Sequence, residues 1–247
     1  MTENLPIVIT GAGGFLGRSL VEVMSAVRPV RASDRCSLSG DGVMGDVADP
    51  EFADRLLAGA GGLVISHMLS RAPGAYDHPK APLEVNSAAT ATLFEAAVRA
   101  GCRKVVLISS TSVVDAHVRK GTFLETSLPF SPGDIYGLSK TLQEQIAAYY
   151  HHRHGIAVAI LRPAYVTDED SMTDKYGRHK ETVNWQFIDR RDIATAALAA
   201  LDLPDLGLET FFISGHPECE THMDIASAKA RLHWEPRYTF TSFPKDN

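Results

Sequence analysis

The feature that most constrains this chain is a glycine turn between an apolar run and an amphipathic stretch, in the segment LPIVITGAGGFLG. Residues 7–9 predict a buried strand, and the residues after the turn have helical spacing. Gly11, Gly14 and Gly17 permit a tight turn and a close phosphate, and the helix start offers free N–H groups. This order predicts a dinucleotide-binding α/β domain. A glycine-rich turn without a ligand is the alternative, and the flanking strand and helix argue against it.

The composition fits one α/β domain, or a domain with a small appendage. Of the 247 residues 45% are hydrophobic, which supports a sizeable core. The net charge of −6 lacks the basic excess of nucleic-acid-binding proteins, so no nucleic-acid partner is expected. Cys36, Cys102 and Cys219 are widely spaced and odd in number, which favours a reducing compartment without disulfides. No apolar run approaches the ~20 residues of a membrane span and no secretory signal precedes the first strand, so we expect a cytoplasmic protein without a membrane partner.

A second strand is predicted over residues 30–33 and finishes at Asp34. This carboxylate follows Gly17 by 17 residues, near the position of an acid that binds the adenosine ribose hydroxyls. An acid there favours NAD and repels the 2′-phosphate of NADP. Arg18 and Arg35 argue for NADP, because an arginine can hold that phosphate. The sequence favours NAD over NADP, and an aspartate that only forms a turn is the alternative for Asp34.

Apolar runs and helical periodicity alternate along the rest of the chain. This alternation predicts a Rossmann-type, doubly wound, mostly parallel sheet with helices on both faces. Asp49 followed by Pro50 is typical of a helix start. Residues 115–132 contain glycine and prolines and predict a loop. The predicted strands are residues 42–46, 63–65, 104–109, 156–161 and 210–214, and the predicted helices are residues 50–58, 81–100, 134–154 and 193–203.

Tyr136 and Lys140 are four residues apart on a predicted helix, so both side chains lie on one face. A tyrosine with its ordinary pKa near 10 is a poor base at neutral pH, but a neighbouring ammonium favours the phenolate. Such a pair can take a proton from a substrate hydroxyl while hydride leaves to a nicotinamide. A further hydroxyl must hold the same oxygen, and a hydroxyl cluster begins at Ser110 after a predicted strand. An ordinary exposed helix face is the alternative, but the conjunction with the glycine turn is specific.

These motifs resemble the extended branch of the short-chain dehydrogenase/reductase superfamily, the NAD-dependent epimerase/dehydratase family. TGAGGFLGR is similar to the opening of that branch, and KARLHWEPRYTF resembles its terminal segment. The resemblance therefore covers residues 5 to about 240. It implies Ser110 as the catalytic hydroxyl, with Thr111 as the next choice, together with Tyr136 and Lys140.

The resemblance also implies NAD as the cofactor and residues that hold it. Asp46 would lie by the adenine ring, and the backbone after Pro163 would meet the nicotinamide amide. Asn86 would help to place Lys140 through backbone and water contacts, and a solvent-facing helix residue is the alternative. His67 is expected to be a packed structural histidine rather than a catalyst. The predicted cofactor-binding set is Gly11, Gly14, Phe15, Leu16, Gly17, Asp34, Arg35, Asp46, Val47, Met68, Asn86, Tyr136, Lys140 and Pro163.

The segment after Arg162-Pro163 is short compared with that of nucleotide-sugar epimerases and dehydratases. We expect a single Rossmann-fold domain over residues 1–247, in which residues 164–187 and 215–247 form a small substrate lobe. This compact layout resembles the uronate dehydrogenases of the same family. The run of Lys175, Arg178, His179 and Lys180 can pair with a carboxylate or phosphate, and a solvated loop is the alternative. The substrate-binding candidates are Ser70, Thr111, Arg178 and Lys180.

The predicted function is NAD-dependent oxidation or reduction of a hydroxyl or carbonyl on a small sugar or sugar acid. One alternative is a nucleotide-sugar epimerase or dehydratase with an internal NAD redox cycle, and another is a non-catalytic dinucleotide-binding regulator. The family resemblance implies a homodimer formed through residues 81–100 and 134–154. His151, His152 and His154 end a predicted helix, where positive charge complements the helix dipole. A metal site there is the alternative, and no metal is predicted.

Overall fold

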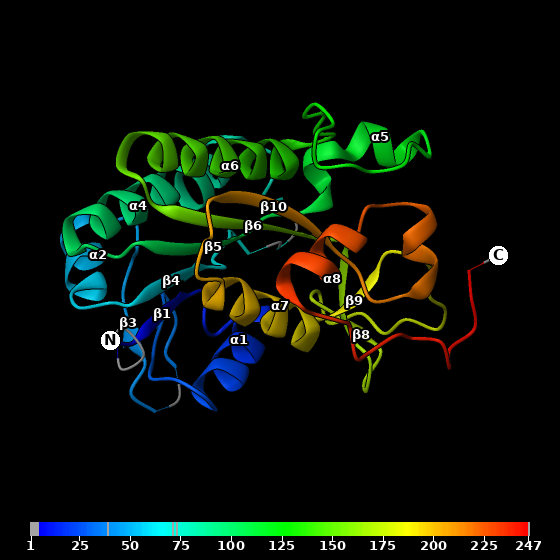
Figure 1. Cartoon of the computed structure of the whole chain (residues 1–247), viewed down its shortest axis with the longest axis horizontal. Coiled ribbons are helices and arrows are strands. Elements are labelled where there is room, and N and C mark those ends of the chain that lie inside the picture. The colour runs from blue at the N-terminus through cyan, green and yellow to red at the C-terminus, as the bar shows by residue number, and fades with distance from the viewer. Residues whose placement is uncertain (1–4, 39, 71, 73, 247) are drawn as a thin grey trace.

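A seven-stranded parallel sheet forms the centre of the computed structural model, which describes residues 5–38, 40–70, 72 and 74–246 (Figure 1). The strand order is β10-β6-β5-β4-β1-β2-β3, so the first strand of the chain lies between β2 and β4. Sequence order reverses at β1 and β4, which is the switch point of a doubly wound sheet. The strands are β1 Ile7–Thr10, β2 Val30–Asp34, β3 Val43–Met44, β4 Gly62–Ile65, β5 Lys104–Ile108, β6 Ala157–Pro163 and β10 Leu208–Ile213.

Helices cover both faces of this sheet, as the sequence predicted. α2, α4 and α6 lie on one face of the sheet, and α1 and α7 lie on the other, where α8 packs against α7 and β10 (Figure 1). Asp49 caps α2 by accepting a hydrogen bond from the Glu51 N–H at 3.0 Å, and Pro50 is the first helical residue. The helices are α1 Phe15–Ser25, α2 Pro50–Leu57, α4 Ala89–Ala100, α6 Ile135–His154, α7 Arg190–Asp202 and α8 Ala226–Leu232.

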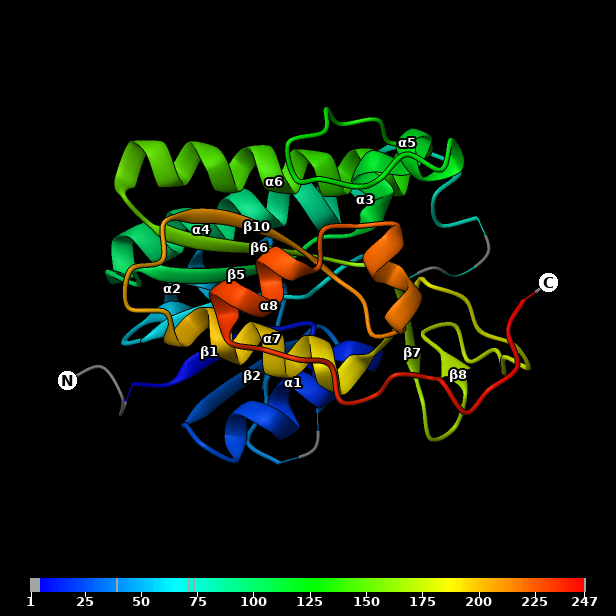
Figure 2. The same cartoon turned by 45° about the vertical axis from the view of Figure 1, so that its right-hand side comes forward.

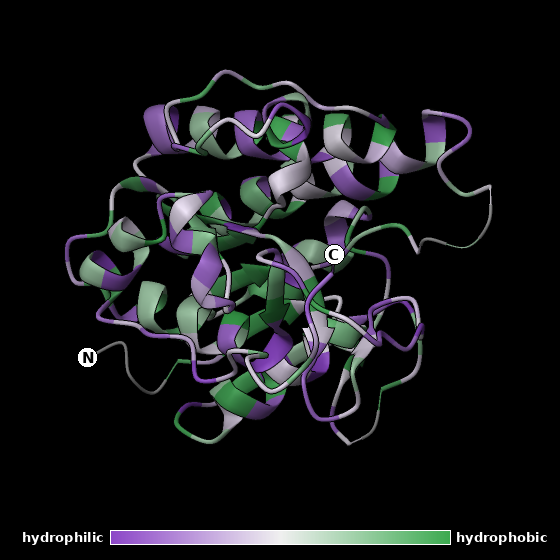
Figure 3. Cartoon of the chain, turned by 90° about the vertical axis from the view of Figure 1, so that its right-hand side faces the viewer, coloured by the Kyte–Doolittle hydropathy of each residue, from purple (hydrophilic) through white to green (hydrophobic). Residues whose placement is uncertain are grey.

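Alternating side chains of the central strands enter two separate apolar cores. Val8 and Leu63 pack toward α2 and α4, whereas Ile9 and Val64 pack toward α1 and α7. All four side chains are fully buried. Figure 3 shows the strands as a hydrophobic interior, with polar residues on the outer helices and loops. Continuous apolar strands are required here because helices cover both faces of the sheet.

Three local structures differ from the sequence prediction. The predicted loop 115–132 begins with α5, Asp115–Arg119, which follows the short 3-10 helix η2, Thr111–Val114. The predicted helix 81–100 is composite, since α3, Lys80–Pro82, and a π-helical segment η1, Leu83–Ala88, precede α4. The helix predicted from residue 193 begins at Arg190, because the Asp189 side chain caps it by accepting from the Arg191 N–H at 2.8 Å.

A second, three-stranded sheet lies in the segment after β6, within the described residues. Its order is β8-β7-β9, with β7 Tyr165–Asp168 parallel to β9 Phe187–Asp189 and antiparallel to β8 Thr173–Asp174. We call residues 164–189 the lid. The segment 184–188 resembles an edge strand of the family, but its strand residues belong to β9 of this small sheet and not to the main one. Sequence periodicity missed β7 and β8 because they are short and contain threonine and aspartate.

The C-terminal segment returns along α7 and reaches the lid (Figure 2). It contains the 3-10 helix η3, Pro217–Thr221, and α8. Asp192 of α7 accepts hydrogen bonds from the backbone N–H groups of Arg237 and Tyr238 at 3.0 and 2.9 Å. The Phe240 N–H donates to the Glu169 carboxylate of the lid. In the ranges described above, no helix combines the length and apolar character needed to cross a membrane.

Gly17 provides a test of how α1 packs on the glycine turn. A Cβ at this position would lie 2.0 Å from the Gly11 carbonyl oxygen, so Gly17→Ala must displace the helix or the turn. We expect the free energy of unfolding to fall by about 3 kcal/mol, in the range of overpacked cores. Urea denaturation measures this. Gly207→Ala is the matched control, because its Cβ meets no heavy atom within 4 Å. Equal stability of the two variants would contradict the close packing.

Candidate active site

A cavity of about 540 Å³ lies where the strands of the main sheet reach their carboxyl ends. The β1–α1 turn, the ends of β2, β4 and β5, the start of α6 and the lid all contribute to its wall. Parallel strands bring these segments together because their carboxyl ends share one edge. The predicted residues that line it are Gly11, Gly14, Phe15, Leu16, Gly17, Asp34, Arg35, Asp46, Val47, Met68, Ser70, Ser110, Tyr136, Lys140 and Pro163.

The glycine turn presents backbone rather than side chains to this cavity. Gly11 has a φ of +69°, and its Cβ position would lie 2.7 Å from the Cα of His67, so only glycine fits. Gly14 is the N-cap of α1 and supplies no side chain to cap it. The N–H groups of the first turn are therefore free of a side-chain acceptor at a positively polarised helix end. This arrangement fits a dinucleotide pyrophosphate.

Asp34 is fixed at the end of β2 by two backbone donors. Its carboxylate accepts from the Gly13 N–H at 2.9 Å and from the Cys36 N–H at 3.1 Å. The side chain thus has a defined position on the cavity wall. Arg35, on the same wall, pairs with Asp46 at 3.6 Å, and the Arg18 Nε donates to the Gly13 carbonyl at 3.0 Å.

Tyr136, Lys140 and Ser110 all lie on the wall of this cavity. The Lys140 Nζ donates to the carbonyl of Ile108 at 2.8 Å, which ties α6 to the end of β5. The Ser110 hydroxyl accepts from the Ser112 N–H at 3.1 Å and so caps η2. Burial and the neighbouring Lys175 ammonium lower the pKa of Lys140 to about 7, and the Glu144 carboxylate opposes this shift.

Asn86 is buried and does not line the cavity, so the solvent-facing alternative is wrong. Its Oδ1 accepts from the Leu69 N–H at 2.7 Å, and its Nδ2 donates to the Ser139 Oγ at 2.9 Å. Ser139 in turn donates to the Tyr136 carbonyl at 2.8 Å. Asn86 therefore links the loop after β4 to the first turn of α6 from the π-helical segment. Its side chain reaches Lys140 only indirectly, through Ser139 of the same helix.

A second, smaller cavity of about 210 Å³ adjoins the first beneath the lid. The two share Ser110 and Tyr136, and Thr111 lines only the smaller one. The Tyr136 ring packs edge-on against Tyr76 at 5.7 Å between centroids, and the Lys175 Nζ lies 5.2 Å from its centroid. The side chains near Tyr136 are thus hydroxyl, aromatic and cationic. The full lining is Ser110, Thr111, Ser112, Asp115, Val118, Tyr136, Ala164, Tyr165, Val166, Lys175, Tyr176 and Gln186.

Arg178 and Lys180, the predicted substrate cations, line neither cavity. The Arg178 Nε donates to the buried Asp174 carboxylate at 2.9 Å, and its Nη2 donates to the Tyr165 hydroxyl at 3.2 Å. The Lys180 Nζ lies 5.0 Å from the Tyr165 ring. The turn after Asp174 therefore directs Arg178 into a structural ion pair. Lys175 is the lysine of that basic run that lines both cavities.

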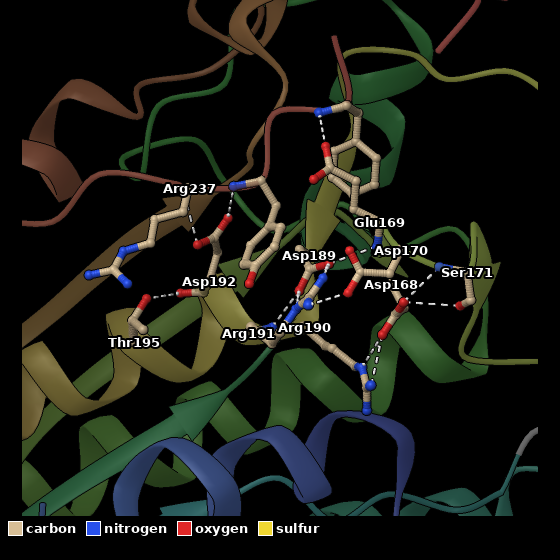
Figure 4. A network of polar contacts seen from close by, with 12 residues as sticks. Asp168, Glu169, Asp170, Ser171, Asp189, Arg190, Arg191, Asp192, Thr195 and Arg237 are labelled. Atoms are coloured by element: carbon tan, nitrogen blue, oxygen red, sulfur yellow. Dashed lines mark hydrogen bonds and ion pairs between the residues drawn. The ribbon is translucent and has the colours of Figure 1, made fainter. Parts of the chain in front are cut away.

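A polar network fixes the lid to the N-terminal end of α7 (Figure 4). The Asp168 carboxylate accepts from the Arg190 Nε at 2.8 Å and from the Ser171 N–H at 3.0 Å. The Arg190 guanidinium also lies 5.1 Å from the ring of Phe15, a residue of the cavity wall. Arg190 thus connects the lid to α1, the helix that follows the glycine turn.

The sequence model of the NAD dependent epimerase/dehydratase family matches residues 7–213. The chain belongs to this family. A relative, the L-arabinose 1-dehydrogenase (NAD(P)(+)) of Haloferax volcanii, is 26% identical over 252 residues, which span 94% of this chain and 96% of that protein. A uronate dehydrogenase of Pseudomonas syringae pv. tomato is 28% identical over 169 residues, which span 63% of this chain and 58% of that protein.

Two solved structures share the fold of this family member. A short-chain dehydrogenase/reductase superfamily protein from Agrobacterium tumefaciens with bound NAD has a TM-score of 0.81 and 20% identity, covering 95% of this chain and 93% of that one. Uronate dehydrogenase from Agrobacterium tumefaciens has a TM-score of 0.79 and 22% identity, covering 98% of this chain and 87% of that one. Together with the parallel sheet, these matches establish the Rossmann-type fold of the superfamily.

Several side chains of this epimerase/dehydratase family protein line the cavities without having been predicted to do so. Tyr176 and Gln186 come from the lid, where the sequence offered only a basic run as a signal. His67 lines the larger cavity but is buried and hydrogen-bonded through Nδ1 to the Thr10 hydroxyl at 3.0 Å. Burial lowers the pKa of His67 to about 4, so this ring is neutral at pH 7.

The terminal histidines of α6 form no metal-binding cluster with other described residues. His151 contacts the Ile156 carbonyl through Nδ1 at 2.8 Å, close to the helix end.

The low pKa of Lys140 predicts a pH dependence of stability. An unfolded lysine keeps a pKa of 10.5, so between pH 7 and 10.5 the unfolded state binds more protons and stability rises with pH. Without cofactor, the free energy of unfolding of the wild type relative to Lys140→Met should rise by about 1 kcal/mol per pH unit from pH 7.5 to 9.5. Urea denaturation at several pH values measures this slope. Lys120→Met, at an exposed position, is the control, and a flat difference for Lys140→Met would contradict the lowered pKa of the buried Lys140.

Proposed function

We propose that this protein is an NAD-dependent oxidoreductase acting on a hydroxyl or carbonyl of a small sugar or sugar acid. The observation that carries this proposal is that Tyr136, Lys140 and Ser110 line one cavity and that Tyr136 and Ser110 also line the smaller one. The relatives named above are sugar and sugar-acid dehydrogenases. The small volume beneath the lid favours a small substrate over a nucleotide sugar.

In this proposal Tyr136 and Lys140 act together on the substrate hydroxyl. The Tyr136 oxygen takes the hydroxyl proton, while Ser110 donates a hydrogen bond to the same substrate oxygen. NAD, held by the glycine turn and Asp34, would supply the acceptor for the hydride on the adjacent carbon. The Lys140 ammonium stabilises the negative charge on the tyrosine, and the Ile108 carbonyl holds that ammonium at 2.8 Å. The reverse transfer reduces a carbonyl.

NAD is the proposed cofactor in preference to NADP. The Asp34 carboxylate on the cavity wall would accept from ribose hydroxyls and repel a 2′-phosphate. Both candidate arginines already have partners, since Arg35 pairs with Asp46 and Arg18 donates to Gly13. The remaining predicted cofactor residues on the wall, from Gly11 to Pro163, would complete the site. Asn86 would act through Leu69 and Ser139 rather than by touching the cofactor.

The proposed substrate site is the smaller cavity beneath the lid. Thr111 and Gln186 offer hydrogen bonds there, and the ammonium of Lys175 offers a charge for a carboxylate. Ser70 lies on the wall of the larger cavity, where it would contact only a substrate that extends into it. Residues 164–187 and 215–247 form this substrate lobe within one Rossmann-type domain in our proposal.

An epimerase or dehydratase acting on a nucleotide sugar is the second candidate. A relative, the UDP-glucose 4-epimerase of Vibrio cholerae, is 31% identical over 174 residues, which span 65% of this chain and 51% of that protein. A non-catalytic dinucleotide-binding regulator would need only the glycine turn, so the three reactive side chains argue against it.

The protein is further proposed to be a cytoplasmic homodimer. Its three cysteines are free thiols, which suits a reducing compartment. On α6, Leu138 and Tyr149 are exposed and Leu142 and Ile146 are half-buried, so an apolar stripe follows one side of the helix. Such a stripe beside α4 suits an isologous helix pair.

The proposal is tested by measuring the turnover of free sugars, uronic acids and nucleotide sugars with NAD and with NADP. We expect net NADH formation with a small sugar or sugar acid, measured by nicotinamide absorbance. Tyr136→Phe should lower kcat by at least about 1,000-fold and leave the Kd for NAD within about threefold, because only the proton acceptor is lost.

Two other outcomes have distinct meanings. A changed nucleotide sugar without net NADH would identify the epimerase alternative. Turnover retained by Tyr136→Phe would remove Tyr136 from the chemistry.

Lys175 should determine the preference for an acidic substrate. We expect Lys175→Met to raise the KM for a uronic acid about 10- to 100-fold, as for loss of a charge-assisted hydrogen bond, and to leave the KM for a neutral aldose unchanged. Lys180→Met is the matched control, because Lys180 lines neither cavity. Initial rates over a range of substrate concentrations give both values. A larger effect from Lys180→Met would mean that the lid turns its other lysine to the substrate.

A further inference from the structure

Glu144 is a buried carboxylate behind the residues proposed for the chemistry. It lies on α6 four residues after Lys140 and eight after Tyr136, and 3% of it is exposed. Residues at this spacing follow one side of a helix. A carboxylate at such depth requires hydrogen-bonding partners, because an unpaired buried charge is very costly.

Two side chains at the ends of β5 and β6 satisfy this carboxylate. The Arg162 guanidinium binds it in a bidentate manner, with Nε at 3.0 Å from Oε1 and Nη2 at 2.7 Å from Oε2. The Ser109 hydroxyl donates to Oε1 at 2.5 Å. The guanidinium is in turn held near two aromatic rings, at 5.5 Å from that of Phe130 and 5.4 Å from that of Phe212. These contacts therefore fix the positions of the Glu144 carboxylate, the Arg162 guanidinium and the Ser109 hydroxyl relative to one another.

The partners of Glu144 are direct neighbours of cavity residues. Ser109 follows β5 and immediately precedes Ser110, and its own N–H donates to the Leu161 carbonyl of β6 at 2.7 Å. Arg162 immediately precedes Pro163 at the end of β6. Both Ser110 and Pro163 line the larger cavity. One carboxylate thus joins the helix that carries the tyrosine and lysine to the two strand ends that complete the wall.

Stability alone does not account for this ion pair. Replacing a buried, paired carboxylate and guanidinium with apolar side chains of similar size is often neutral or stabilising. What such side chains cannot supply is direction, since the bidentate pair and the serine hydroxyl define both the distance and the rotation of α6 relative to β5 and β6.

We propose that Glu144 is a positioning residue for the reaction, which holds Ser110 in register with Tyr136 and Lys140 through Ser109 and Arg162. This inference rests on the proposed function and adds one residue to it. Glu144 does not line either cavity, so it acts through its neighbours and not on the substrate. It also opposes the depression of the Lys140 pKa that burial and Lys175 cause.

Two variants test this role. Glu144→Gln keeps the shape but places an amide N–H₂ against the guanidinium, and we expect kcat to fall about 100-fold, as for a small misplacement of reacting groups. The Kd for NADH should change by less than about threefold, because the glycine turn is untouched. Glu209→Gln is the matched control, since Glu209 forms a similar two-point pair with Arg231 away from both cavities, and its kcat should equal that of the wild type.

The double variant Glu144→Met/Arg162→Met removes both charges and so avoids an unpaired guanidinium if the single variant fails to fold. We expect a Tm equal to or above that of the wild type but a kcat still at least tenfold lower. Hydrogen–deuterium exchange of residues 109–114 provides a readout independent of turnover and should be faster in this variant. Wild-type kcat and wild-type exchange in the double variant would overturn the inference. Absence of turnover in the wild type would overturn only the proposed function. The exchange rates of residues 109–114 would then decide the positioning role.

Discussion

The close approach of α1 to the glycine turn is the contact on which the rest of the site depends. A methyl group at Gly17 would lie 2.0 Å from the Gly11 carbonyl, so the helix start can reach the end of β1 only because that atom is missing. β1 lies between β2 and β4 in the sheet, and its position therefore sets the carboxyl ends of both neighbours. Asp34 at the end of β2 is hydrogen-bonded to Gly13 of the same turn, which makes the turn and the acid one rigid unit. A cavity wall built in this way needs little adjustment when a ligand arrives.

The parts of the fold that sequence predicted are those specified by local pattern. Apolar runs marked the central strands because helices bury both faces of the sheet, and the four-residue spacing of Tyr136 and Lys140 marked one side of α6. The lid was predicted only as a segment, since β7 and β9 pair across residues far apart in sequence and contain polar side chains. The choice among the lid cations was likewise beyond the sequence. It is decided by the buried Asp174, which binds Arg178 and leaves Lys175 at the cavity.

Two ion pairs, one buried and one partly buried, hold the site in position. Behind the strand ends, Glu144 and Arg162 connect α6 to β5 and β6. In the lid, Asp168 of β7 pairs with Arg190 of α7 (Figure 4). The Arg190 guanidinium also lies over the Phe15 ring. Both ion pairs are directional and both reach residues of the cavity wall. The apolar cores fix the layers of the domain, whereas these ion pairs fix how the layers meet at the site.

The hydrogen bond between Phe240 and Glu169 joins positions 71 residues apart. The glycine-turn end of the cavity, by contrast, is formed largely by β1, β2 and β4, which lie within the first 65 residues. Because a domain folds as a unit, the two ends of the cavity depend on parts of the chain that are far apart in sequence and must assemble together. The lid therefore reaches its final position only when the segment around Phe240 has packed against it.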